Sequence, residues 1–305
     1  MTYALRFQVL LLPNLAWSEF RRRYLHLEEL GFDLVGTADH LVDWTHPPNP
    51  WFEQWTQLAA IASETRRIRL STLVTQIPLR NPAMLARQAL TVDHISNGRL
   101  ELGLGTGLEI DPSYGMMGVP NWSAKERVAR FAEYVDLVDQ LLSHEVTTYK
   151  GRFYEVNDTV MNPRPVQRPR PPLMVAALGP VMLKHAVRYA DIWNSASFAE
   201  AFDAQLEETH DRIRRIDAQC AAIGRDPASL RRSYLMFDVK ARSSGGQINY
   251  YASETAFADM AQRVLDLGIT DIGLYYPVLD EQLPVFEHIA RRVIPELKAK
   301  HDSGG

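Results

Sequence analysis

Short apolar runs typical of strands alternate with amphipathic helical patterns along almost the whole chain. Eight strand-like runs are present, and a helical pattern follows each of them. Parallel strands need a long crossover, usually a helix, so this alternation predicts a parallel sheet covered by helices. Eight such units within 305 residues favour a closed (β/α)8 barrel, the TIM-barrel form of an α/β fold. An open, doubly wound sheet is the alternative for the same pattern.

Capping residues mark the expected ends of several helices. Ser18 is the expected N-cap of the first helix, and Asn81 with Pro82 begins the third. Ser123 and Glu126 have capping-box spacing at the start of the fourth helix. The expected strands are 4–12, 32–38, 68–76, 99–104, 173–177, 192–196, 232–240 and 269–276, and the expected helices are 18–30, 51–65, 81–95, 123–142, 179–189, 199–223, 254–267 and 283–298.

The connections between these elements differ in length. A small hairpin is expected at 146–156, and the proline-rich segment 162–172 should be an extended connector. Two connections, 105–123 and 241–253, are too long for plain turns, and we expect them as loop insertions at the C-terminal face of the barrel. No internal repeat or second-domain linker is evident. We therefore expect one domain over 1–298 and a flexible tail at 299–305.

Composition limits the classes of function. The chain carries 33 basic and 37 acidic side chains, a net charge of −4, with no basic cluster among aromatic residues, so nucleic-acid binding is not expected. No apolar run approaches the roughly 20 residues of a membrane helix, and no signal peptide is evident. The single cysteine, Cys220, excludes a disulfide framework within the chain. These features favour a cytoplasmic protein that does not bind membranes.

Two chemical classes lack their usual motifs. The first strand is not followed by His-x-His, and no glutamate-rich cluster suits a metal ion, so no metal site is expected. No Gly-x-Ser-x-Gly elbow is present, which disfavours the chemistry of serine hydrolases.

Polar residues that could carry chemistry follow the second strand. Barrel enzymes place their sites at the C-terminal ends of the strands. Asp39 and His40 stand there, and Trp44 follows in a proline-rich loop. A histidine exchanges protons near neutral pH, and an adjacent carboxylate could orient it. In the alternative interpretation Asp39 caps a loop and His40 fills the mouth of the barrel.

Small residues follow the fourth and fifth strands. The run 103–109 lets the backbone approach a flat ring or a phosphate, and Glu109 could hydrogen-bond a ring or serve as an acid. The run is not a dinucleotide fingerprint, because Leu108 stands where a third glycine is needed. Ala177, Leu178 and Gly179 lead into a helix whose N-terminus is a candidate anion site. Ordinary loops and turns are the alternative for both segments.

Five motifs give the chain a resemblance to a known family. They are Gly31-Phe32-Asp33 ahead of Asp39-His40, Arg80-Asn81-Pro82-Ala83, the segment 93–100, Gly103-Leu104-Gly105-Thr106-Gly107, and Ala190-Asp191-Ile192-Trp193-Asn194. Over nearly its whole length the chain resembles the bacterial luciferase-like flavin monooxygenase superfamily. The pair Asp39-His40 with Trp44, and the run 105–107 with Glu109, are similar to the branch that uses coenzyme F420, a deazaflavin.

The resemblance implies roles for these residues. His40 would take a proton from a substrate hydroxyl or donate one to a product, and Trp44 would line the ring pocket. Glu109 would assist proton movement near the ring, and Asp39 would hydrogen-bond the pyrimidine end of the cofactor. The other expected cofactor contacts are Leu73 and Val74, which would share the family's non-proline cis peptide bond behind the ring, with Thr75, Gly105, Thr106, Gly107, Ala176, Ala177, Leu178 and Gly179.

The implied function is hydride transfer between coenzyme F420 and a small organic substrate, with His40 handling the proton. Three alternatives are an FMN-dependent monooxygenase that uses reduced flavin and O2, a non-catalytic flavin-binding protein, and a barrel glycosidase with Asp39 and Glu109 as its carboxylate pair. The resemblance also implies a homodimer and a flavin or F420 reductase as partner.

The chain departs from the sugar-phosphate dehydrogenase of the F420 branch. Its first strand ends in Pro13 and Asn14, where that enzyme has a carboxylate, and its cationic phosphate-binding trio has no evident counterpart. Glucose 6-phosphate is therefore not the substrate we expect. We expect a more apolar substrate, near Met116, Met117, Trp122 and the loop 241–253.

Overall fold

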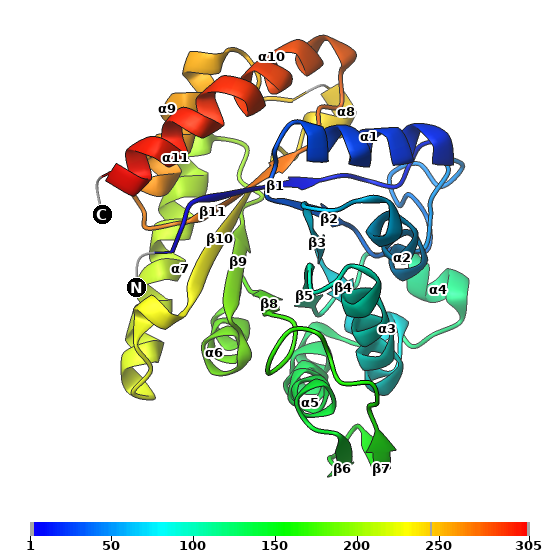
Figure 1. The fold of residues 1–305 in the computed structure, drawn as a ribbon. Coiled ribbons are helices and arrows are strands. Elements are labelled where there is room, and N and C mark those ends of the chain that lie inside the picture. The colour runs from blue at the N-terminus through cyan, green and yellow to red at the C-terminus, as the bar shows by residue number, and fades with distance from the viewer. Residues whose placement is uncertain (1–2, 245, 304–305) are drawn as a thin grey trace. The chain divides into compact units, whose positions relative to one another are not determined.

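The computed structural model describes residues 3–244 and 246–303. Its parallel sheet has the strand order β3-β2-β1-β11-β10-β9-β8-β5-β4, and β3 also pairs with β5 (Figure 1). Because that pairing returns the order to its start, the sheet is that of a (β/α)8 barrel, as the alternation predicts. Its strands are β1 (Arg6–Leu10), β2 (Leu34–Thr37), β3 (Arg69–Thr72), β4 (Thr75–Gln76), β5 (Leu100–Gly105), β8 (Leu173–Ala176), β9 (Ile192–Ala196), β10 (Arg231–Met236) and β11 (Asp271–Tyr275).

Helices separate the strands of this sheet along the chain. They are α1 (Trp17–Glu29), α2 (Gln54–Glu64), α3 (Pro82–Ile95), α4 (Ser113–Met117), α5 (Ala124–Ser143), α6 (Pro180–Tyr189), α7 (Phe202–Ala222), α8 (Ala241–Ser244), α9 (Glu254–Leu265), α10 (Leu283–His288) and α11 (Ile294–Ser303). The antiparallel strands β6 (Val146–Lys150) and β7 (Glu155–Val160) form the expected hairpin, which extends further than predicted. No helix in the described part of the chain is long and apolar enough to cross a membrane.

Two predicted helix caps are confirmed. The Asn81 side chain accepts a hydrogen bond from the backbone N–H of Ala83 at the start of α3, and Ser123 accepts one from Glu126 at the start of α5. Such caps satisfy backbone donors that the first turn of a helix leaves unpaired. The predicted cap at Ser18 is wrong, because α1 already begins at Trp17.

Three elements differ from the predicted pattern. The third strand, expected at 68–76, is divided into β3 and β4 at Leu73 and Val74, which are joined by the expected non-proline cis peptide bond. The last helix contains a π-helical turn at Ile289–Val293 between α10 and α11. Helix α11 continues to Ser303, so 299–303 are helical rather than a tail, while 304–305 lie outside the described residues.

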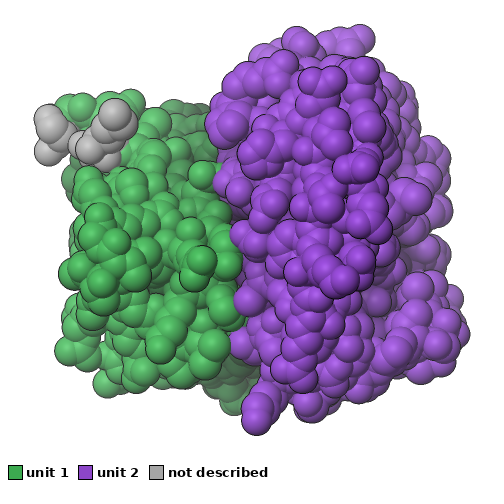
Figure 2. Space-filling view, turned by 90° about the horizontal axis from the view of Figure 1, so that it is seen from below, with its two compact units in different colours: residues 1–11, 26–35, 176–305 green, residues 12–25, 36–175 purple. Residues whose placement is uncertain are grey.

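The chain forms two compact units (Figure 2). Unit 1 consists of Met1–Leu11, His26–Val35 and Ala176–Gly305, and unit 2 of Leu12–Leu25 and Gly36–Val175. In unit 1, β11 pairs in parallel with β1 and β10, and β10 pairs with β9. In unit 2, β5 pairs in parallel with β3, β4 and β8.

Each unit buries a stripe of helical side chains. In unit 2, α5 buries Phe131, Tyr134, Val138 and Leu141 completely, at the spacing of one helical face. Burying an aliphatic or phenylalanine side chain of this kind stabilises the fold by roughly 1.5–3 kcal/mol. In unit 1, α7 buries Ile213, Ile216 and the free thiol of Cys220 in the same way. The helices are therefore fixed against the strands by their apolar faces, which leaves the strand ends to position polar groups.

Candidate active site

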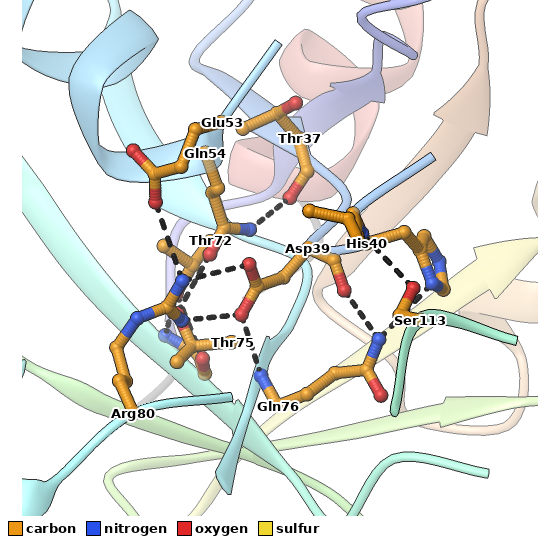
Figure 3. Close-up of polar contacts among 12 residues, drawn as sticks. Thr37, Asp39, His40, Glu53, Gln54, Thr72, Thr75, Gln76, Arg80 and Ser113 are labelled. Atoms are coloured by element: carbon orange, nitrogen blue, oxygen red, sulfur yellow. Dashed lines mark hydrogen bonds and ion pairs between the residues drawn. The ribbon is translucent and has the colours of Figure 1, made fainter. Parts of the chain in front are cut away.

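The polar residues at the ends of β2, β4 and β5 meet in one buried network within unit 2 (Figure 3). Asp39 and His40 follow β2, Gln76 is the last residue of β4, and Asp111 lies in the loop after β5. Because these strands are parallel, their C-terminal ends lie at the same edge of the sheet. This is the end at which (β/α)8 barrels place their catalytic groups.

A carboxylate is hydrogen-bonded to the imidazole of His40. The distance between His40 Nδ1 and Asp111 Oδ2 is 2.6 Å, and the Asp111 side chain is completely buried while that of His40 is 19% exposed. Burial alone would raise the pKa of the Asp111 carboxyl, but hydrogen bonds from His40, Ser113 and Gln76 lower it well below its usual range. Asp111 is therefore ionised and presents a negative charge to one nitrogen of the ring.

The amide of Gln76 connects the members of this network. Its Nε2 donates to the backbone oxygen of Asp39 and, at 2.9 Å, to Asp111 Oδ2, and it lies 3.0 Å from His40 Nδ1. Its Oε1 accepts from the hydroxyl of Tyr114. Gln76 and Tyr114 are both buried, so each hydrogen bond replaces one that water would otherwise make.

Two indole rings border His40. The Trp44 ring stacks on the imidazole with centroids 5.2 Å apart and planes inclined by 19°, and the Trp51 ring meets it edge-on at 5.6 Å. The indole Nε1 of Trp51 is buried and has no partner among the described residues. His40 therefore combines one charged neighbour with a largely apolar, aromatic surrounding.

Asp39 is held by a cation rather than left free. Its two carboxylate oxygens accept from the guanidinium of Arg80, and one of them also accepts from the backbone N–H of Gln76 at 2.9 Å (Figure 3). Burial would lower the pKa of Arg80, but the charge of Asp39 raises it above its usual value. Asp39 thus uses three of the roughly four lone-pair positions of its carboxylate in these contacts.

The glycines after β5 lie where no side chain fits. Gly107 has φ +71°, and a Cβ there would lie 2.1 Å from the Tyr114 hydroxyl and 2.4 Å from Gln76 Oε1. A Cβ on Gly105 would lie 2.5 Å from Cγ2 of Val74. The backbone between them is anchored by Arg127, whose Nη1 donates to the carbonyl of Thr106 at 2.9 Å. These glycines therefore allow the backbone to pack closely against Val74, Tyr114 and Gln76.

Two predicted site residues make other contacts. The carboxylate of Glu109 accepts from the backbone N–H of Ala124 at the N-terminus of α5, and its carbonyl accepts from Asn121. Of the two acids, Asp111 and not Glu109 contacts the imidazole of His40. The hydroxyl of Thr75 is buried and donates to Gln54 Oε1 at 2.8 Å. Asp111 was missed because it lies beyond the glycine-rich run, although an acid two residues after Glu109 is visible in the sequence.

The predicted anion site belongs to unit 1. Gly179 is the N-cap of α6, and Pro180 lies in the first turn. Because glycine has no side chain, no side-chain cap binds the backbone N–H groups at this helix end. Ala177 uses its own N–H in a hydrogen bond to the carbonyl of Asn194.

In the described residues no group of three metal-ligating side chains is close enough to hold an ion.

Comparison with known proteins gives a family match and similar sequences. The model of a family described as luciferase-like monooxygenase matches residues 4–244. An F420-dependent glucose-6-phosphate dehydrogenase of Amycolatopsis mediterranei is 35% identical over 167 residues, 54% of this chain and 49% of that protein. The F420-dependent glucose-6-phosphate dehydrogenase of Intrasporangium calvum is 33% identical over 219 residues, which are 66% of this chain and 64% of that protein. The chain therefore spans less than two thirds of the length of these relatives.

Solved structures share the fold at low sequence identity. One is an F420-dependent secondary alcohol dehydrogenase in complex with an F420–acetone adduct. Its TM-score is 0.79 at 18% identity, and the match covers 95% of this chain and 100% of that chain. A monooxygenase from Streptomyces bottropensis has a TM-score of 0.76 at 23% identity, covering 96% of this chain and 100% of that one. These likenesses confirm the predicted barrel.

Proposed function

This chain belongs to the luciferase-like monooxygenase family, and from that membership we propose that it is an oxidoreductase that transfers hydride between coenzyme F420 and a small organic substrate. The proposal is supported by the names of its similar sequences, which are F420-dependent dehydrogenases. The single observation that carries the proposal is the His40–Asp111 pair beside two indole rings, because this arrangement suits proton exchange next to a flat ring.

Residues of unit 2 fit a flat heteroaromatic ring. Gly105 and Gly107 have no space for a side chain, because a Cβ would meet Val74 at Gly105 and Tyr114 and Gln76 at Gly107. The buried, unpartnered Nε1 of Trp51 is a donor that a ring carbonyl or hydroxyl could satisfy. His40, Trp44 and Val74 would line the ring. Coenzyme F420, when bound, supplies the carbon that accepts or gives the hydride.

His40 is the residue that we propose to handle the proton. Nδ1 is bonded to Asp111, and Nε2 makes no hydrogen bond with any described residue. As an alcohol is oxidised to a ketone or aldehyde, Nε2 would accept the hydroxyl proton while the carbinol hydrogen leaves as hydride. In the reverse direction Nε2 would return the proton to the carbonyl oxygen. Trp44 and Trp51 would limit the access of water to this nitrogen.

Aromatic residues of unit 1 form a partly exposed cluster. Phe198, Phe237 and Tyr275 stand at the C-terminal ends of β9, β10 and β11. Ring centroids are 5.7 Å apart for Phe198 and Phe237 and 5.9 Å for Phe237 and Tyr275, and Phe198 is 57% exposed. The exposed phenyl ring of Phe198 favours an apolar ligand at this cluster of unit 1, whereas a phosphorylated sugar needs cationic groups at its binding site.

The test is turnover by a His40 variant. We predict that His40→Ala lowers kcat for oxidation of a simple secondary alcohol by about 10²–10⁴-fold, the usual contribution of a general base. Affinity for F420 should fall much less than kcat, because Trp44 and Val74, which would also line the ring, are still present. Turnover is measured in anaerobic assays as the decrease in the absorbance of oxidised F420 while the alcohol is oxidised. Undiminished kcat in His40→Ala would remove His40 from the mechanism.

A further inference from the structure

We propose that Asp111 is the positioning residue of this site: its carboxylate fixes His40 with the proton on Nδ1 and so leaves Nε2 as the proton acceptor. The inference rests on the proposed function for its catalytic consequence, but the protonation pattern that it assigns is a property of the free protein. The observation behind it is the completeness of the hydrogen-bond network around one imidazole nitrogen.

The first step is the orientation of the Gln76 amide. The Tyr114 hydroxyl donates to Oε1, so the other end of the amide is the NH2 group. That group has two hydrogens, and two carboxylate or carbonyl oxygens accept them, the backbone oxygen of Asp39 and Oδ2 of Asp111. No hydrogen of Gln76 is left for His40 Nδ1, although the two nitrogens are only 3.0 Å apart.

The second step places the proton between His40 and Asp111. A contact of 2.6 Å between Nδ1 and Oδ2 requires one hydrogen between the two atoms. Two donors besides the imidazole, the Gln76 amide and the Ser113 backbone N–H, already point at the carboxyl. They favour its ionised form, so the hydrogen belongs to Nδ1. The neutral imidazole is therefore the Nδ1–H tautomer, and its lone pair is on Nε2.

The third step is that hydrogen bonds fix the orientation of the Asp111 carboxylate. Its Oδ1 accepts from the backbone N–H of Ser113 at 2.8 Å, which closes a tight turn at the start of α4. The Ser113 hydroxyl in turn accepts from the backbone N–H of Leu41, the residue after His40, at 2.9 Å. The loop after β2 and the loop after β5 are thus joined at two points, by the His40–Asp111 and the Leu41–Ser113 contacts. A side chain held in this way is preorganised for its task.

The other charged groups near the pair have contacts of their own. Asp39 is paired with Arg80, and Arg127 lies over the Tyr114 ring at 4.5 Å while it binds the carbonyl of Thr106. Among the described residues, Asp111 is therefore the carboxylate in direct contact with the imidazole. When Nε2 takes up a proton, the resulting imidazolium lies against this negative charge, which stabilises it.

The direct test is the protonation state of His40 in the free protein. With 15N-labelled histidine, we predict that His40 shows a protonated Nδ1 and an unprotonated Nε2 near pH 8, with a downfield Nδ1–H signal, assigned by its loss in His40→Gln. A protonated Nε2 with a bare Nδ1 would overturn the proposal. This measurement needs no cofactor and no turnover. Its result therefore tests the assigned protonation state independently of the proposed function.

The catalytic test replaces Asp111 by Asn. We predict that Asp111→Asn lowers kcat by about 10²–10⁴-fold with F420 affinity nearly unchanged, because an amide can donate to Nδ1 and reverse the tautomer. In the residual activity the acid limb of the pH profile moves to lower pH, since the imidazolium loses its counter-charge. Asp111→Glu should restore part of kcat. The matched control is Asp158→Asn, an exposed residue at φ +43° in the β6–β7 hairpin, where Asn is well tolerated.

Two results would contradict this catalytic role. One is a kcat and pH profile for Asp111→Asn that match those of the Asp158→Asn control. The other is a loss confined to KM or to F420 binding, which would assign Asp111 to ligand binding instead. If Asp111→Asn does not fold, the 15N measurement on the wild-type protein still decides the proposal.

Discussion

Two buried carboxylates lie close to His40, and their surroundings give them different tasks. Asp39 is neutralised by Arg80 and fixes the backbone of Gln76, so its contribution is structural. Asp111 faces the imidazole and carries its negative charge to Nδ1. The pairing of one acid with a cation and the other with a histidine therefore distinguishes Asp39 from Asp111, to which we assign the role in proton transfer.

At this scale Asp111 also makes stability depend on pH. Burial would raise the pKa of its carboxyl, but its hydrogen bonds lower it below the ordinary value of about 3.9. A carboxyl with a lowered pKa stabilises the fold above its unfolded pKa, and this contribution is lost as the pH falls through the folded pKa. We predict that the wild type exceeds Asp111→Asn in free energy of unfolding near neutral pH, and that the excess shrinks below about pH 4.

Urea denaturation of both proteins between about pH 3 and pH 8 measures this difference. An excess that grows as the pH falls below about 4 would contradict the assigned ionisation of Asp111.

Residue roles were only partly predictable from the sequence. Asp39, His40 and Trp44 could be located because they follow a recognisable strand at the end where barrels place their sites. Glu109 was predicted and Asp111 was missed, because the residue that reaches His40 depends on the path of the backbone after Gly107. A left-handed residue there and the short helix α4 turn Asp111 inward, while Glu109 reaches α5.

At the scale of elements, the end of β5 is the segment on which the network depends. Gly107 has φ +71°, and its missing Cβ leaves room for the Tyr114 hydroxyl and Gln76 Oε1. Gly224 also has φ +71°, but a Cβ there would meet nothing within 4 Å. The two glycines thus share the backbone conformation and differ in the space around it.

We predict that Gly107→Ala destabilises the protein more than Gly224→Ala does. Both variants carry the left-handed backbone penalty of about 1–2 kcal/mol, and Gly107→Ala adds the displacement of Gln76 and Tyr114. The comparison requires the free energy of unfolding of each variant and its kcat. Turnover should fall in Gly107→Ala alone. Equal losses of stability in the two variants would show that the space beside Gly107 is not needed.

Elements were predicted best where local signals and packing agree. Strand β9 matches its predicted range, and the caps Asn81 and Ser123 fix the starts of α3 and α5. The division between β3 and β4 gives no signal in hydrophobic periodicity, and only the family resemblance indicated it. The π-helical turn Ile289–Val293 has an ordinary helical pattern, so tertiary packing decides it.

For the whole molecule, the closed strand order and the family match carry the assignment of the fold, and the cofactor remains the central claim. Luciferase-like relatives and structural neighbours include both F420-dependent enzymes and a monooxygenase, so the fold alone does not select the cofactor. The His40–Asp111 pair is what favours hydride transfer coupled to proton exchange.

The most direct test of this account is to titrate the purified protein separately with coenzyme F420 and with FMN and to measure the dissociation constant of each. We predict that F420 binds at least about tenfold more tightly than FMN, a difference of about 1.4 kcal/mol. Tighter binding of FMN, with oxygen consumption when the flavin is reduced, would contradict the proposed function and identify a flavin monooxygenase instead.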